Sequence, residues 1–266
     1  MDLGFKGKVA LITGAGSQVG FGREIAVLMA KEGCRDIAVS DINLGDVEKT
    51  AAELKSLGCK SLAIKADITR KAEVVAMADK VLAEFGRIDI LVNNAGAILH
   101  KDNIPLEEQD QEIWAKQIDL NLFGTMRVTQ AVLPHMRKQK YGVIVNISSG
   151  SSHQINMGVG VYAMSKDCID LFTRQLAMTE AKSNIRVNCV SPGPAPTNFG
   201  AGVLRTGPPP TPEQQKQRAE MMVKMFPLGR IGTGADIAYA TAFLASDLTC
   251  NVTAQIFHVS GGLVVF

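Results

Sequence analysis

The sequence contains no apolar run long enough to cross a bilayer. Its first residues, MDLGFKGKVALITG, also lack the layout of a charged and then apolar signal with a cleavage site. The short apolar run in this segment ends in a glycine loop, which is typical of a first β-strand. We therefore expect a cytoplasmic protein.

The sequence has little net charge, and its cysteines and histidines are scattered. These features argue against a nucleic-acid or membrane partner, a disulfide framework and a metal site. The 28 basic and 26 acidic residues leave a net charge of +2, so neither nucleic acid nor an anionic membrane is expected as a partner. The five cysteines lie far apart and form no Cys-x-x-Cys pair, which favours free thiols in a reducing compartment. The four histidines show no zinc-type spacing, and no metal site is expected.

What the sequence does contain is an alternation of short β-branched segments with longer amphipathic ones. Apolar runs such as VALIT, DILVN and GVIVNIS suit strands that are covered on both faces of a sheet. Strict alternation of strand and helix predicts an α/β fold with a doubly wound parallel sheet of the Rossmann type. Neither a repeat nor a linker divides the chain, so we expect a single domain over residues 1–266.

The expected elements follow this alternation. Strands are predicted over 8–13, 36–41, 61–66, 88–93, 142–148, 186–190 and 255–259. Helices are predicted over 22–31, 44–57, 71–85, 108–137, 158–181 and 234–245, the fourth being long enough for two helices or a bent one. The segment 198–226, with its triple proline, breaks the rhythm and is interpreted as a substrate-binding loop or lid.

A glycine-rich segment, TGAGSQVGFG over 13–22, lies between the first expected strand and helix. Glycines allow the backbone to approach a pyrophosphate, and a helix N-terminus offers free N–H groups. Asp41 ends the second strand, where a carboxylate can accept the adenine ribose hydroxyls and would repel the extra phosphate of NADP. A plain turn and a helix-capping aspartate are the alternatives. The positions of both features favour an NAD site.

Further motifs make the chain resemble the classical short-chain dehydrogenases/reductases over nearly its whole length. After the glycine loop come Asp67-Ile68, NNAG over 93–96, LNLFG over 120–124, NISSGSS over 146–152, YAMSK over 162–166, Pro192-Gly193 with Thr197, and then PLGRIG and FLASD. Their order is that of the family.

The resemblance implies a nicotinamide-dependent oxidoreductase acting on a small-molecule alcohol or ketone, and a homotetramer. Four residues match the family's catalytic set: Asn121, Ser149, Tyr162 and Lys166. The cofactor contacts implied by the resemblance fall on Gly14, Ser17, Gln18, Gly20, Phe21, Gly22, Asp41, Ile42, Asp67, Ile68, Asn93, Ala95, Gly96, Tyr162, Lys166, Pro192, Gly193, Ala195 and Thr197.

The chain departs from the family pattern at the glycine loop and near its end. Five residues, 15–19, separate Thr-Gly from Gly-x-Gly, which is more than usual, so the pyrophosphate turn must bulge. Ala254 and Ser260 stand where the family usually has Gly and Asp. We expect these two substitutions to affect packing only.

Tyr162 and Lys166 suit proton transfer. A free tyrosine has a pKa near 10, so only about one in a thousand is ionised at pH 7. Lys166 follows four residues later on an expected helix, which places both side chains on one face. A cation there favours the phenolate, so the spacing predicts a tyrosine tuned for general acid/base catalysis, with Ser149 stabilising charge on the substrate oxygen.

Other polar or apolar residues are candidates for the substrate pocket. We hypothesise substrate contacts for His153, Gln154, Asn156 and Phe199, although ordinary surface-loop positions are the alternative. A cluster of Met221, Met222, Met225 and Phe226 has helical spacing and indicates either subunit packing or an adaptable lid over an apolar substrate.

Three functions remain open. The first is an NAD-dependent alcohol dehydrogenase or ketoreductase, and the second is an NADPH-dependent 3-oxoacyl-thioester reductase, against which Asp41 argues. The third is a non-catalytic dinucleotide sensor or scaffold, which the fold alone does not exclude. The complete Asn–Ser–Tyr–Lys set favours an enzyme.

Overall fold

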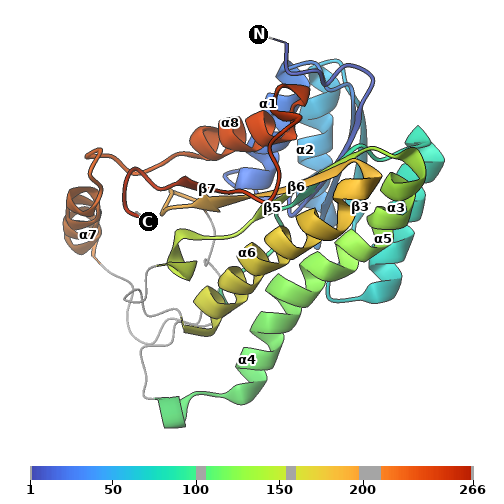
Figure 1. Cartoon of the computed structure of the whole chain (residues 1–266). Coiled ribbons are helices and arrows are strands. Elements are labelled where there is room, and N and C mark those ends of the chain that lie inside the picture. Colours follow the sequence, from blue (N-terminus) through green and yellow to red (C-terminus); the bar gives the residue numbers. More distant parts are fainter. Residues whose placement is uncertain (1, 100–105, 154–159, 198–210, 265–266) are drawn as a thin grey trace.

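The computed structural model describes residues 2–99, 106–153, 160–197 and 211–264, arranged around one seven-stranded sheet (Figure 1). The strands are β1 (Val9–Thr13), β2 (Asp36–Asp41), β3 (Lys60–Lys65), β4 (Ile90–Asn93), β5 (Gly142–Ile147), β6 (Ile185–Pro192) and β7 (Ile256–Val259). All pairs are parallel, in the order β3-β2-β1-β4-β5-β6-β7. The strand order reverses between β1 and β4, since β2 and β3 lie on one side of β1 and β4 to β7 lie on the other. In sheets of this kind, ligands bind at such a reversal, beside the carboxyl ends of the strands.

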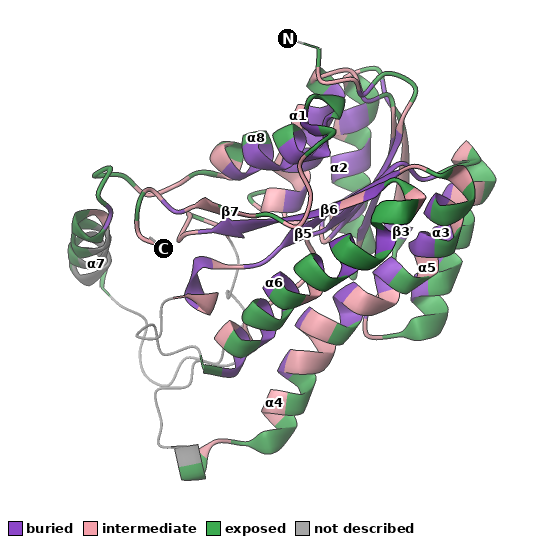
Figure 2. Ribbon diagram, viewed as in Figure 1, coloured by how far each residue is buried: buried purple, intermediate pink, exposed green. Residues whose placement is uncertain are grey.

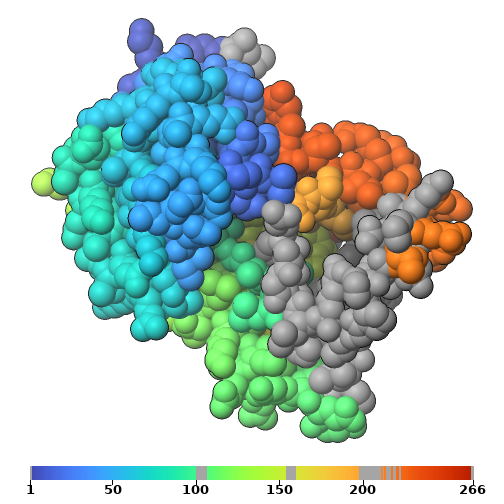
Figure 3. Space-filling model, turned by 180° about the vertical axis from the view of Figure 1, so that it is seen from behind, coloured from blue at the N-terminus to red at the C-terminus, as the bar shows by residue number. Residues whose placement is uncertain are grey.

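Helices cover both faces of this sheet. They are α1 (Phe21–Lys31), α2 (Leu44–Ser56), α3 (Lys71–Phe85), α4 (Gln111–Ile118), α5 (Gly124–Gln139), α6 (Gly160–Glu180), α7 (Pro212–Met225) and α8 (Gly234–Ala245). Helices α1, α2 and α8 lie on one face, and α3, α5 and α6 lie on the other (Figure 1). Seen from behind, the blue segment of α1 and α2 adjoins the orange-red segment of α8 (Figure 3). The doubly wound α/β architecture predicted from the sequence is therefore confirmed.

The core consists of two apolar layers separated by the sheet. Alternate residues of β1 enter opposite layers: Ala10 and Ile12 pack towards α1 and α8, whereas Val9 and Leu11 pack towards α3 and α5. The central strands are accordingly buried throughout (Figure 2). Burial on both faces is the physical reason for the continuous apolar runs in the sequence.

The segment expected over 108–137 forms two helices, as its length allowed, and its helical start lies at Gln111 instead of residue 108. The side chain of Asp110 accepts a hydrogen bond from the Glu112 N–H and starts α4, which ends at Ile118. A π-helical turn, Asp119–Phe123, then leads into α5. Such turns insert a residue into the helical ladder and often occur at functional sites. This one carries Asn121.

The expected lid over 198–226 lies partly outside the described residues, which omit 198–210. The remainder forms α7, a helix that stands away from the sheet layers (Figure 1). Met221 and Met225 are exposed, whereas Phe226 is buried. The lid interpretation stays a prediction.

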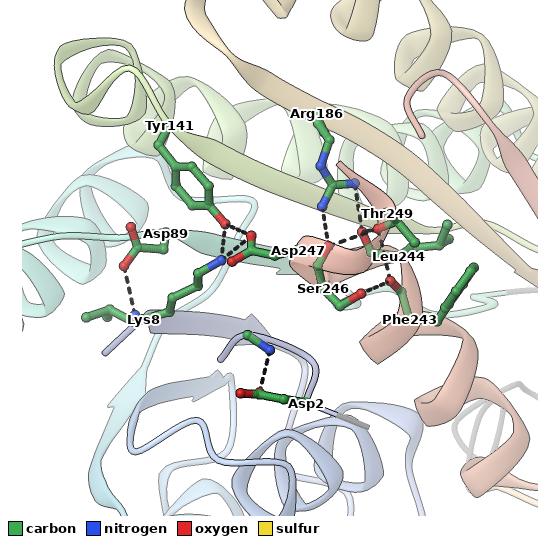
Figure 4. A network of polar contacts seen from close by, with 12 residues as sticks. Asp2, Lys8, Asp89, Tyr141, Arg186, Phe243, Leu244, Ser246, Asp247 and Thr249 are labelled. Carbon is green, nitrogen blue, oxygen red and sulfur yellow. Dashed lines mark hydrogen bonds and ion pairs between the residues drawn. The ribbon is translucent and has the colours of Figure 1, made fainter. Parts of the chain in front are cut away.

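A polar cluster joins distant segments at the amino-terminal edge of the sheet, opposite the expected site (Figure 4). Lys8 Nζ contacts both the Tyr141 hydroxyl and the Asp247 carboxylate. Arg186 donates to the carbonyl oxygens of Leu244 (3.0 Å) and Ser246 (2.9 Å). These contacts fasten the end of α8 to the starts of β1, β5 and β6. In the described part of the chain, no helix is both long and apolar enough to span a membrane.

Candidate active site

The glycine loop begins where β1 ends, at the carboxyl edge of the sheet. Gly14 has a φ of +66°, in the left-handed region that favours glycine. A Cβ at Gly14 would lie 2.6 Å from Cα of Ala95, and a Cβ at Gly22 would lie 2.5 Å from the Gly14 carbonyl oxygen. Close packing of the loop on α1 and on the turn after β4 therefore requires both glycines.

The residues that lengthen this loop fold onto α2. Gln18 Nε2 donates to the Gly16 carbonyl oxygen (2.8 Å) and lies 3.3 Å from Thr50 Oγ1. The Thr50 hydroxyl in turn donates to the Ala15 carbonyl oxygen (2.8 Å). The expected bulge is thus an ordered turn that two side chains brace.

Two polar features of the loop suit a pyrophosphate. Ser17 Oγ is buried and has no hydrogen-bond partner among the described residues. Gly20 is the N-cap of α1, and no side chain caps that helix. Free N–H groups at a helix N-terminus and an unpartnered hydroxyl are donors that phosphate oxygens satisfy. Ser17, Gly20 and Phe21 therefore fit a bound dinucleotide.

Asp41, at the end of β2, lies against the glycine loop. Its Oδ2 accepts the Gly16 N–H (2.8 Å), and its Oδ1 accepts the Asn43 N–H (3.1 Å). Each carboxylate oxygen has two lone pairs, so both can still accept a ribose hydroxyl. The next residue, Ile42, has an exposed side chain at the same edge.

Asp67 and Ile68 follow β3, but their side chains have different surroundings. The Asp67 carboxylate accepts the Thr69 N–H (2.9 Å) and hydroxyl (2.7 Å). The Ile68 side chain is buried against Gly124 of α5, where an added Cβ would lie 2.6 Å from Ile68 Cδ1. A cofactor could therefore meet the Asp67 carboxylate but only the backbone of Ile68.

The turn after β4 is held by two asparagines with separate tasks. Asn93 Nδ2 donates to Thr129 Oγ1 (3.0 Å) and Asn146 Oδ1 (2.9 Å), so its side chain joins β4, β5 and α5. Asn94 Nδ2 donates to the carbonyl oxygens of Thr13 (2.9 Å) and Gly14 (2.8 Å). Asn94, which the predicted site residues omit, thus fixes the glycine loop to this turn.

Ser149 and Tyr162 lie together, as predicted. Ser149 follows β5, and its Oγ is 2.8 Å from Ser151 Oγ. Tyr162, in the first turn of α6, is buried and hydrogen-bonded to the Ser149 side chain. Lys166, one turn further along α6, places its Nζ 5.9 Å from the centroid of the Tyr162 ring.

Lys166, Asn121 and Gly96 meet beside this pair. Lys166 Nζ donates to the Ile147 carbonyl oxygen at the end of β5 (2.9 Å). Asn121 Nδ2 donates to Ser165 Oγ (3.0 Å), which joins the π-helical turn to α6. A Cβ on Gly96 would lie 2.9 Å from Asn121 Oδ1 and 3.4 Å from Lys166 Nζ. The four residues of the predicted catalytic set therefore belong to one site.

The pKa of Tyr162 differs from the sequence-based expectation of a lowered value. Burial raises it to about 12, and the hydrogen bond with Ser149 acts in the opposite direction. Burial also lowers the pKa of Lys166 to about 8, while the negative charge of Asp170 favours its ammonium form. Loss of hydration thus outweighs the effect of the Ser149 hydrogen bond on the phenol. In this state Tyr162 holds its proton at neutral pH.

The segment after β6 forms the other wall of the expected cofactor site. Pro192 ends β6, and a Cβ at Gly193 would lie 2.9 Å from Cα of Ser260. Ser260 is buried, and its Oγ accepts the Val264 N–H (3.1 Å), which is a packing role as expected. Ala195 and Thr197 follow, both partly buried.

Of the predicted substrate residues, His153 alone lies within the described ranges; Gln154, Asn156 and Phe199 lie outside them. His153 Nε2 is 3.1 Å from Oδ2 of Asp170, a buried residue of α6. The sequence-based prediction missed Asp170. Its position four residues after Lys166, on the same helix face, was the available signal.

Comparisons with known proteins agree with this arrangement. A family model described as Enoyl-(Acyl carrier protein) reductase matches residues 14–264. The chain is 36% identical to the 3-oxoacyl-[acyl-carrier-protein] reductase of Thermotoga maritima over 260 residues, covering 98% of this chain and 99% of the relative. It is also 36% identical to the 7alpha-hydroxysteroid dehydrogenase of Escherichia coli over 262 residues, covering 98% and 96%.

Solved structures are similar over the same length. A 7 alpha-hydroxysteroid dehydrogenase complexed with NADH and 7-oxo glycochenodeoxycholic acid matches with a TM-score of 0.87 and 35% identity, covering 98% of this chain and 96% of that one. A short-chain type dehydrogenase/reductase from Mycobacterium marinum matches with a TM-score of 0.87 and 29% identity, covering 100% and 98%. The chain therefore belongs to the classical short-chain dehydrogenase/reductase family, whose members are oxidoreductases that bind a nicotinamide dinucleotide.

Proposed function

We propose that the protein is an NAD(H)-dependent oxidoreductase that interconverts a secondary alcohol and a ketone, with Tyr162 as the general acid/base. The observation that carries this proposal is the grouping of Ser149, Tyr162 and Lys166 beside the glycine loop, at the carboxyl edge of the sheet. A bound nicotinamide would supply or accept the hydride.

Each side chain has a distinct part in the proposed proton transfer. Tyr162, with its raised pKa, keeps a proton that it can give to a carbonyl oxygen as that oxygen gains negative charge. Ser149 can donate a hydrogen bond to the same oxygen once its hydroxyl turns away from Ser151. The Lys166 ammonium near the ring reduces the cost of the phenolate that remains. Alcohol oxidation uses the same steps in reverse.

The choice of NAD over NADP is supported by the charges around Asp41. A 2′-phosphate would lie near this carboxylate, and one cation each of α1 and α2 is already paired with a carboxylate. Arg23 Nη2 lies 2.6 Å from Glu53 Oε1, and Lys49 Nζ lies 2.8 Å from Asp46 Oδ1. Arg23 and Lys49 would thus do little to compensate the repulsion between the phosphate and Asp41, although Lys65, the partner of Asp41 in the β2–β3 register, is a further cation there.

A second candidate is an NADPH-dependent 3-oxoacyl-thioester reductase. The similarity to the Thermotoga maritima 3-oxoacyl-[acyl-carrier-protein] reductase favours it. Asp41 argues against it for the electrostatic reason above. Similarity to a 7alpha-hydroxysteroid dehydrogenase adds hydroxysteroids to the substrates worth testing.

A substrate panel tests the proposal and separates the candidates. The purified protein is mixed with NAD or NADP and with 3-hydroxyacyl thioesters, hydroxysteroids, cyclic alcohols and sugars, and cofactor reduction is followed by absorbance. We expect NAD-linked turnover of at least one secondary alcohol. Thioester turnover with NADP alone would support the second candidate. NAD binding without any turnover would favour a sensor.

We also propose that the protein is a homotetramer. Large apolar side chains are exposed on α6 (Leu171 and Met178) and around α8 and β7 (Tyr239, Phe243 and Phe257). An apolar groove of about 310 Å³ also runs between α5 and α6. Exposed apolar surface of this kind marks interfaces. Light scattering of the wild type and a Leu171→Glu variant tests the assignment, which a monomeric wild type would contradict.

A further inference from the structure

A buried carboxylate that the proposed reaction does not use lies one helical turn beyond Lys166. Asp170 is fully buried in α6. Its Oδ2 is 3.1 Å from both Ser152 Oγ and His153 Nε2, and its Oδ1 is 3.3 Å from Cys189 Sγ. No lysine or arginine of the described ranges forms an ion pair with it. A buried carboxylate is costly unless its hydrogen bonds are complete, so this position calls for an explanation.

These contacts join the two segments that carry the catalytic side chains. Ser152 and His153 belong to the loop that starts at Ser149, whereas Asp170 is on the helix of Tyr162 and Lys166. Within the loop, Ser152 Oγ lies 2.6 Å from the Ser149 carbonyl oxygen. A single carboxylate thus lies between the catalytic serine loop and the catalytic helix.

Counting protons identifies His153 as the main link. The Ser152 hydroxyl has one proton, and the shorter contact assigns it to the Ser149 carbonyl oxygen rather than to Asp170 (2.6 against 3.1 Å). His153 can then donate its Nε2–H to Asp170 Oδ2, which fixes the tautomer and the ring orientation. The Cys189 thiol donates to the other oxygen.

The charge of Asp170 also acts on its surroundings. The groups that face it are His153 from the serine loop, Cys189 from β6, His258 from β7 and Lys166 from its own helix. Its negative charge favours the ammonium form of Lys166, against the effect of burial.

We propose that Asp170 is a positioning residue of the active site, which holds the Ser149 loop against α6 through His153 and places a negative charge behind Lys166. The inference rests on the proposed function, because it concerns the same catalytic groups. A rigid loop matters because a displacement of about 1 Å between catalytic groups can cost roughly 10²-fold in rate.

Two substitutions separate the contact of Asp170 with His153 from the effect of the Asp170 charge on Lys166. Asp170→Ala removes both, whereas Asp170→Asn keeps a side-chain oxygen for the His153 N–H and removes the charge together with the oxygen that accepts from the Cys189 thiol. The matched control is Glu180→Gln, because Glu180 is another buried carboxylate of α6 but pairs with Arg137 (2.7 Å), away from the serine loop.

We expect Asp170→Ala to lower kcat about 10- to 100-fold with little change in the KM for the dinucleotide. Asp170→Asn should retain more of kcat. On the alkaline side of the pH profile, kcat/KM of this variant should decline at a lower pH than kcat/KM of the wild type. The reason is that Lys166 loses the negative charge that favours its ammonium form. Glu180→Gln should lower the melting temperature and leave both the rate and the pH profile unchanged.

Hydrogen exchange of the peptide spanning 148–153 tests the contact between His153 and Asp170 and does not depend on an activity assay. Its amides include Ser152 N–H, which donates to the Ser149 carbonyl oxygen (3.0 Å), and His153 N–H, which donates to Gly150 (3.2 Å). Exchange should accelerate in Asp170→Ala and in His153→Ala, with no further increase in the double variant. A wild type without turnover would defeat the proposed function and leave this measurement valid. Unchanged exchange in Asp170→Ala, or an unshifted pH profile in Asp170→Asn, would overturn the inference.

Discussion

The carboxylate of Asp41 accepts the backbone N–H of Gly16 over 2.8 Å, so the end of β2 and the glycine loop form one unit. Only glycine fits at position 16, because a Cβ there would lie 2.7 Å from Cγ of Asp41. The residue proposed to select the cofactor therefore also shapes the loop that would hold its pyrophosphate.

We predict that the protein prefers NAD to NADP by about 10²–10³-fold in kcat/KM, the scale of one close charge repulsion at a protein surface. Asp41→Ala should narrow this gap. Lys65 is the partner of Asp41 in the β2–β3 register and remains as a cation on the same side of the ladder. Steady-state rates with both cofactors measure the effect, and Glu48→Ala, at an exposed acidic residue of α2, serves as the control. Equal or better use of NADP by the wild type would contradict the assignment.

We predict that Tyr162→Phe lowers kcat about 10²–10⁴-fold, which is the usual contribution of a general acid/base. Dinucleotide binding, measured by fluorescence titration, should change little, since the phenyl ring still fills the buried position. Tyr141→Phe is the matched control, because Tyr141 contacts Lys8 and Asp247 at the opposite edge of the sheet. A Tyr162→Phe protein with normal rates would exclude the proposed mechanism.

The fold was predictable because its main determinant is local in sequence. Strands such as Val9–Thr13 are apolar on both faces, and the amphipathic segments between them have helical spacing. The length of the segment indicated a break between two helices, but the position and form of the break between α4 and α5 were not predictable. Both depend on a π-helical turn in which Asn121 turns inward to Ser165, a tertiary contact that leaves no periodic signal.

The residues of the candidate site were predictable where sequence motifs mark them. Their pKa values and tertiary contacts were not, because these depend on burial and on segments distant in the sequence. Spacing indicated that Tyr162 and Lys166 share a helix face, but the raised pKa of Tyr162 comes from burial, which spacing does not report. The bracing of the glycine loop by Gln18 likewise depends on Thr50 of α2, far along the chain. The spacing of Asp170 from Lys166 placed it on the same helix face, but it did not reveal the partners of Asp170, which come from another strand and a loop.

Ala254 gives a prediction for stability. It has a φ of +62°, in the left-handed region, at the position where the family usually has glycine. An alanine there is strained by about 1–2 kcal/mol, which a glycine would relieve. The greater conformational freedom of glycine in the unfolded chain offsets part of this stabilisation. Ala254→Gly should therefore stabilise the protein by about 0.5–1 kcal/mol in urea unfolding. Ala131→Gly, inside α5, should instead destabilise it by about 1 kcal/mol. A loss of stability in Ala254→Gly would contradict this explanation.

Lys166 gives a prediction that links stability to pH. Burial lowers its pKa from 10.5 to about 8, so folding disfavours the ammonium. Below pH 8 Lys166 is charged in both states, and its burial lowers the free energy of unfolding by the full amount. This destabilisation disappears as the pH rises to 10.5, because the folded protein loses the proton first and the unfolded chain loses it near pH 10.5. Each pKa unit corresponds to about 1.4 kcal/mol, so the cost is about 3 kcal/mol.

Lys166→Met removes this cost together with the hydrogen bond to Ile147, whose loss is independent of pH. The free energy of unfolding of the variant minus that of the wild type should therefore fall by about 3 kcal/mol between pH 7 and pH 10.5. Urea unfolding across this range measures the difference. Lys182→Met, at an exposed lysine just beyond α6, should show no such slope. A difference that stays constant with pH would show that the folded protein accommodates the Lys166 ammonium without penalty, and the balance of charges proposed around Tyr162 and Asp170 would then be wrong.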